Sequence, residues 1–122
     1  MSNDTISNKE KYDLEERTAK FGENIVFFCR ELLKDEITRP IINQLIKCGT
    51  SVGANYCEAD DAESKKDFKH KIGICKKESR EVKHFLRMVG AALPEKKEKA
   101  RKLWVEAKEL NLIFNSIYNK VS

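Results

Sequence analysis

Two runs of polar residues near the middle of the chain have a spacing that places several reactive groups on one helix face. Ser51, Asn55 and Glu58 recur at intervals of four and three residues, and Glu78 and Glu81 repeat this interval between Ile74 and Phe85. Carboxylates arranged in this way can bind a metal ion in a helical bundle or act in acid–base catalysis. They are therefore the first residues to test for a reaction.

The rest of the chain does not complete either chemistry. A di-iron bundle needs a Glu-x-x-His pair on each of two helices, and only Glu81 with His84 has this spacing. No nucleophile or oxyanion site accompanies the carboxylates. The four cysteines form no CxxC motif with a nearby His, which favours reduced thiols over a zinc site. We expect no enzyme activity, no metal and no cofactor; a metal-dependent bundle enzyme stays an alternative that metal analysis would test.

The same polar residues favour a structural role. Half-buried polar groups that hydrogen-bond to one another can fix the register of packed helices or a contact between subunits. The predicted polar network consists of Ser51, Asn55, Glu58, Lys77, Glu78 and Glu81. Its counter-charges are expected to come from Arg17, Lys77 or Arg80.

Positive charge is concentrated in the second half of the chain. Residues 1–63 hold eight Lys and Arg against thirteen Asp and Glu, whereas the remainder holds sixteen against seven. Such a basic half is typical of a surface that meets phosphates without sequence choice, although Lys-rich solvated helices are also common. No aromatic residues that would stack on bases alternate with these cations. The predicted nucleic-acid-binding residues, on the outer side of one helix, are Lys65, Lys66, Lys69, Lys76, Lys83 and Arg87.

Hydrophobic periodicity predicts the elements that position these groups. Apolar residues repeat at steps of three and four along segments 13–34, 40–60, 64–92 and 94–121, with polar or proline-containing connections between them. Gly49 and Gly53 interrupt the second segment and indicate a close approach by another helix or subunit. The sequence predicts an all-α, up-down-up-down antiparallel four-helix bundle. Residues 13–122 form its single domain, and residues 1–12 a mobile tail.

The chain shows no feature of a secreted or membrane protein. Its N-terminus is polar, and no window approaches the roughly 18 consecutive apolar residues needed to cross a bilayer. We expect a cytoplasmic location and no membrane partner.

One stretch resembles a known family. Residues 51–59, SVGANYCEA, are followed by Ser64, then Asp67 and Phe68, and then Lys77, Glu78 and Glu81 with Phe85 four positions on. In this order and spacing they resemble the bacterial four-helix bundle proteins encoded in intervening sequences of 23S ribosomal RNA genes. That family is also similar to the accessory variability protein of diversity-generating retroelements.

The resemblance implies a homo-oligomer, most simply a pentamer. It also implies nucleic-acid binding through basic surface and partnership with a nucleic-acid enzyme such as a reverse transcriptase. The alternative within the family is a purely structural or protein-binding oligomer, and the sequence leaves open whether RNA, DNA or neither is bound.

Overall fold

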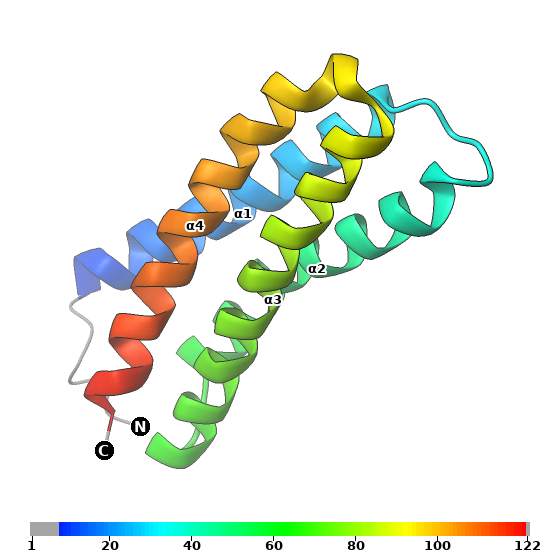
Figure 1. Ribbon diagram of the computed structural model, residues 1–122. Coiled ribbons are helices and arrows are strands. Elements are labelled where there is room, and N and C mark those ends of the chain that lie inside the picture. Colours follow the sequence, from blue (N-terminus) through cyan, green and yellow to red (C-terminus); the bar gives the residue numbers. More distant parts are fainter. Residues whose placement is uncertain (1–7, 122) are drawn as a thin grey trace.

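Four antiparallel helices make up the described part of the chain. The computed structural model describes residues 8–121, with side chains placed from residue 13. The helices are α1 (Asn8–Glu31), α2 (Thr38–Asp60), α3 (Lys65–Ala92) and α4 (Lys97–Lys120), and a short 3₁₀ turn, η1 (Pro94–Lys96), precedes α4. Consecutive helices pack side by side in alternating directions (Figure 1). The predicted up-down-up-down bundle is confirmed.

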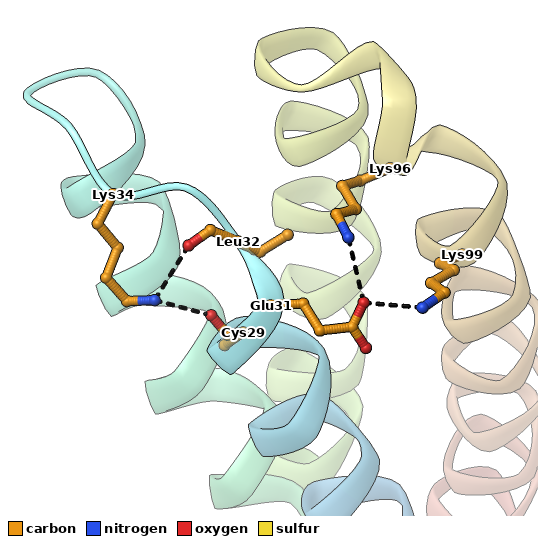
Figure 2. A network of polar contacts seen from close by, with 6 residues as sticks. All are labelled: Cys29, Glu31, Leu32, Lys34, Lys96 and Lys99. Carbon is orange, nitrogen blue, oxygen red and sulfur yellow. Dashed lines mark hydrogen bonds and ion pairs between the residues drawn. The ribbon is translucent and has the colours of Figure 1, made fainter.

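The first helix differs from its predicted bounds at both ends. It begins at Asn8, so the tail predicted for residues 1–12 is wrong from residue 8 onward, and residues 1–7 lie outside the described residues. The segment 8–12 contains no glycine or proline to stop the helix. At the other end α1 stops at Glu31 rather than Lys34, and Lys34 Nζ turns back to donate to the carbonyls of Cys29 and Leu32, each at 3.1 Å, which satisfies groups left free by the helix end (Figure 2).

Local hydrogen bonds begin the next two helices. Asp35 Oδ1 accepts from the backbone amides of Ile37 and Thr38, each at 2.9 Å, while Thr38 Oγ1 donates to the Leu33 carbonyl. Asp35 therefore satisfies the first amides of α2. Ser64 caps α3, since its Oγ accepts from the amide of Asp67 at 3.0 Å.

The core follows the predicted apolar stripes. Every residue of the α3 stripe is buried: Phe68, Ile72, Cys75, Ser79, Val82, Leu86 and Val89. The glycines of α2 admit α1, as expected: a Cβ on Gly49 would lie 2.8 Å from Ile25 Cγ2, and one on Gly53 would lie 3.3 Å from the backbone of Thr18. The close approach is thus made within one chain.

Polar bridges join the first helix to the last. Arg17 Nε and Nη2 donate to both oxygens of Glu106 at 2.8 and 2.7 Å, and Nη2 also reaches Glu109. Near the opposite end of α1, Glu31 accepts from Lys96 and Lys99 at 3.2 and 2.8 Å (Figure 2). These charged contacts lie on the side of the bundle where neighbouring helices, here α1 and α4, approach each other least closely.

Candidate nucleic-acid interface

Three of the predicted lysines lie in the seam between α3 and α4. Lys69 and Lys76 Nζ are 4.6 and 4.3 Å from the ring centre of Tyr118, and Lys83 Nζ is 5.8 Å from that of Trp104. All three lysines are half-buried rather than on the outer side of the helix. The prediction of an outer face is wrong for them, because their aliphatic stems pack against α4 while the ammonium groups stay over aromatic rings.

The opposing side of this seam is a matched row on α4. Trp104, Asn111 and Tyr118 are seven residues apart, as are Lys69, Lys76 and Lys83 on α3. Asn111 Nδ2 donates to the carbonyl of Lys76 at 2.8 Å and to Ser79 Oγ at 3.1 Å, which ties the two helices together at mid-length. The aromatic residues that the basic segment lacks are therefore supplied by another helix.

A second row of cations flanks this seam on each helix. Lys66, Arg80 and Arg87 follow Lys69, Lys76 and Lys83 around α3, and all three are exposed. Arg101 and Lys108 occupy the corresponding positions around α4, and Lys108 Nζ lies 5.7 Å from the centre of the Trp104 ring. Lys97, which is also exposed, lies seven residues before Trp104 and extends the row of Trp104, Asn111 and Tyr118. We define the basic face as these two helix surfaces together: Lys66, Lys69, Lys76, Arg80, Lys83, Arg87, Lys97, Arg101, Trp104, Lys108 and Tyr118.

The basic face carries no carboxylate. Its positions repeat every three or four residues, from Lys66 to Gly90 on α3 and from Lys97 to Tyr118 on α4. They hold only cations, amides, aromatic residues and glycines. Glu106 and Glu109 pair with Arg17 of α1, and Glu78 lies beside Lys77 and Glu81, away from this seam. A polyanion laid along this seam therefore meets positive charge with no opposing charge beside it.

One end of the basic face is hollowed. A cleft of about 370 Å³ lies between α3 and the start of α4, and its lining residues are Leu86, Arg87, Gly90, Ala91, Lys97, Ala100, Arg101 and Trp104. Its floor is apolar and its charged residues are all cations. Of the six predicted contacts, five belong to the basic face; Lys65 is the first residue of α3 and is exposed beside it.

The structure does not bring the predicted polar network together. Among the described residues, Ser51 Oγ donates to the Lys47 carbonyl at 2.6 Å and Asn55 Nδ2 to the Ser51 carbonyl at 2.9 Å, so both bond within their own helix. Glu58 forms an ion pair with Lys71 at 2.7 Å, and its side chain is 57% exposed. Helical side chains of this length reach their own preceding turn more easily than a neighbouring helix.

Glu78 and Glu81 do form a pair. Burial raises the pKa of Glu78 above its ordinary value, and so does a hydrogen bond that protonated Glu78 donates to Glu81, while nearby Lys77 and Lys47 oppose this effect. Lys77 is the weak partner, at 4.0 Å and largely exposed. Of the proposed counter-charges, Arg17 pairs instead with Glu106 and Glu109, and Arg80 belongs to the exposed row of the basic face.

The described residues offer little to a metal or a thiol chemistry. No three His, Cys, Asp or Glu side chains within residues 13–121 gather in a way that could hold a metal ion. The ring of His84 instead packs edge-on against Phe85 at 5.1 Å. Burial raises the pKa of Cys29 to about 11 and that of Cys75 to about 12, so both thiols stay protonated. None of the described helices is long and apolar enough to cross a membrane.

These observations define an antiparallel four-helix bundle with one carboxylate-free basic face. The model of the 23S rRNA-intervening sequence protein family matches residues 10–116, and the chain belongs to that family. A crystal structure of a protein of unknown function from the S23 ribosomal protein family of Bacteroides thetaiotaomicron is similar, with 25% identity and a TM-score of 0.81. The match covers 90% of this chain and 98% of that one. A comparison with curated proteins finds no match.

Proposed function

We propose that this protein is an oligomeric bundle that binds nucleic acid without sequence preference through the basic face. The observation that carries the proposal is the absence of any carboxylate along both helix surfaces that meet there. Phosphate contacts by Lys and Arg supply affinity that is indifferent to sequence. The side chains on this face are suited to such contacts and hold no group suited to cutting or joining a strand.

Assembly and partnership extend the proposal. Several large apolar side chains are exposed, and an oligomer would cover them: Phe27, Leu33, Ile37 and Leu112 are 57–68% exposed. The family resemblance favours a pentamer, which would repeat the basic face around a ring. Bound to a nucleic acid in several places at once, such a ring would act as an accessory to a nucleic-acid enzyme, for example a reverse transcriptase.

The proposal is tested by titrating labelled single-stranded and duplex nucleic acid between about 50 and 200 mM salt, where phosphate-driven binding weakens steeply. The basic-face variant replaces three exposed cations together: Lys66→Gln, Arg80→Gln and Arg87→Gln. If these side chains contact phosphates, the variant should lose about three contacts. The slope of log Kobs against log salt concentration for single-strand binding should then become shallower by about 2, because each contact accounts for roughly 0.7. These positions are chosen because Lys69, Lys76 and Lys83 also pack α4, so their loss would confuse binding with folding.

A matched control removes the same charge elsewhere. Lys20→Gln, Arg30→Gln and Arg39→Gln change three exposed cations on α1 and α2 and lower the net charge equally. This variant should keep the wild-type slope. Equal loss in both variants would show that net charge, and not the basic face, governs binding.

Failure of the wild-type protein to bind any nucleic acid at 50 mM salt would refute the proposal. The exposed apolar residues then favour a structural or protein-binding oligomer. Assembly is measured independently by light scattering, where a mass near 14.1 kDa at micromolar concentration would contradict an oligomer.

A further inference from the structure

The cleft at the end of the basic face differs from the rest of that face in having an aromatic wall. Trp104 forms this wall, the buried Leu86 lies at the floor, and the small residues Gly90 and Ala100 keep the cleft open. A Cβ on Gly90 would already meet Lys97 Cγ at 3.4 Å. A surface that bound only phosphates would need neither the depth nor the indole.

Cations surround the aromatic wall on several sides. Arg87, Lys97 and Arg101 line the cleft, while Lys83 and Lys108 hold their ammonium groups 5.8 and 5.7 Å from the Trp104 ring. These two distances are near the outer limit of about 6 Å for a cation–π contact. The long flexible stems can therefore move aside for a flat ligand at little cost, which leaves both ammonium groups free for its phosphates.

We propose that this cleft is a subsite for one unpaired base of a single-stranded nucleic acid, stacked on Trp104, with its phosphates held by Arg87 and Arg101. The inference rests on the proposed function and deepens it. The volume of about 370 Å³ falls within the range of about 300–1,000 Å³ usual for small-ligand sites. Guanidinium groups suit the phosphates, because their planar fork binds phosphate oxygens in pairs.

The subsite gives the protein a preference that phosphate contacts alone cannot give. Bases in a duplex are paired and stacked inside the helix, so they cannot enter a cleft unless they are extruded, which costs a few kcal/mol. A single strand presents its bases freely, and each base stacked on an aromatic side chain contributes about 1–3 kcal/mol. From the cleft the strand would follow Lys83, Lys76 and Lys69 toward Tyr118, a path of roughly 21 Å at 1.5 Å per residue.

The chain provides its own probe, because Trp104 is its single tryptophan. A short single strand should quench Trp104 fluorescence saturably, whereas a blunt duplex of the same sequence should bind the basic face without quenching. Trp104→Leu should weaken single-strand binding about 5- to 150-fold, the equivalent of one lost stack, and so lower the ratio of single-strand to duplex affinity. Trp104→Phe, which keeps an aromatic face, should restore most of the preference.

A second pair of variants avoids the half-buried tryptophan. Arg101→Gln removes a cation of the cleft, and Lys102→Gln removes its exposed neighbour on the outer side of α4. Only Arg101→Gln should reduce the quenching at a fixed single-strand concentration. Both side chains are exposed, so neither variant should disturb folding, which circular dichroism checks.

The results separate the two proposals. If the single strand binds but does not quench Trp104, and Trp104→Leu keeps the wild-type ratio of single-strand to duplex affinity, the subsite is refuted while the proposed function stands. If neither strand form binds, the proposed function fails and the subsite fails with it. If Arg101→Gln and Lys102→Gln reduced the quenching of Trp104 equally, the assignment of the cleft would also be overturned.

Discussion

Two glycines at the contact between α1 and α2 should respond to the same substitution with opposite sign. Replacing a helical glycine by alanine usually stabilises a helix by about 1 kcal/mol, because alanine loses less conformational freedom. At Gly22 the added Cβ would lie 3.6 Å from the Gly49 carbonyl oxygen, an ordinary van der Waals distance. At Gly49 it would lie 2.8 and 3.0 Å from Ile25 Cγ2 and Cγ1.

The available space decides the magnitude of each effect. Gly22→Ala should raise the free energy of unfolding by about 0.5–1 kcal/mol, since nothing has to move. Gly49→Ala gains the same propensity, but it overpacks Ile25, which is fully buried and cannot turn away. Overpacking a tight core costs about 1–3 kcal/mol, so the net change should be a loss of up to about 2 kcal/mol.

Urea unfolding followed by circular dichroism measures both changes. Repeating both glycine substitutions in an Ile25→Ala background supplies the control. There Gly49→Ala should cost less than in the wild-type protein, because the obstructing atoms are gone, whereas the effect of Gly22→Ala should be the same in both backgrounds. If Gly49→Ala proved as stabilising as Gly22→Ala, with no coupling to Ile25, the reasoning on the α1–α2 contact would be refuted.

Other side chains give further predictions. The raised pKa of Glu78 means that protonation of this carboxyl stabilises the folded state. The stabilisation is present below the usual carboxyl pKa and is lost as the pH rises through the folded-state pKa. Glu78→Gln should therefore raise the melting temperature more at pH 7.5 than at pH 4. A double-mutant cycle of Arg17→Gln and Glu106→Gln should give a coupling of about 1 kcal/mol in unfolding experiments, because the pair is bidentate but one-third exposed. A thiol reagent should label the exposed Cys57 in the native protein and reach the buried Cys75 only on unfolding, as mass spectrometry would show.

Periodicity predicted the fold because long amphipathic helices carry their packing information in every turn. The α3 stripe, including the polar Ser79, is buried as its spacing indicated. The ends of the helices were harder to predict, since the end of a helix depends on which group satisfies its last free amides and carbonyls. Lys34 and Asp35 do so around the α1–α2 connection, and neither role has a unique sequence pattern.

The candidate site was predicted only in part because it depends on two helices. The sequence identified Lys69, Lys76 and Lys83 as cations, but their surroundings come from Trp104 and Tyr118 on α4. The signal that could have found this is the shared interval of seven residues in the two helices, which predicts that they align when packed antiparallel.

The carboxylates were harder still. Their spacing showed that Glu58, Glu78 and Glu81 could share a neighbourhood, but not which cation each would find. Glu58 takes Lys71, and the other two carboxyls share a hydrogen bond.

The position of α3 between α2 and α4 explains how a protein of modest net charge can present a strongly positive surface. Its flank toward α2 carries Glu78 and Glu81, whose charges act on Cys48 of α2, whereas its flank toward α4 carries cations alone. A helix with its side chains is about 10–12 Å across. The screening length is about 8 Å at physiological salt, so the acidic flank contributes little to the potential felt by a strand on the basic face. The total of +4 therefore understates the local charge. For this reason the basic-face variant and its equally charged control should differ in the salt dependence of nucleic-acid binding, whereas a mechanism based on net charge would give both the same salt dependence.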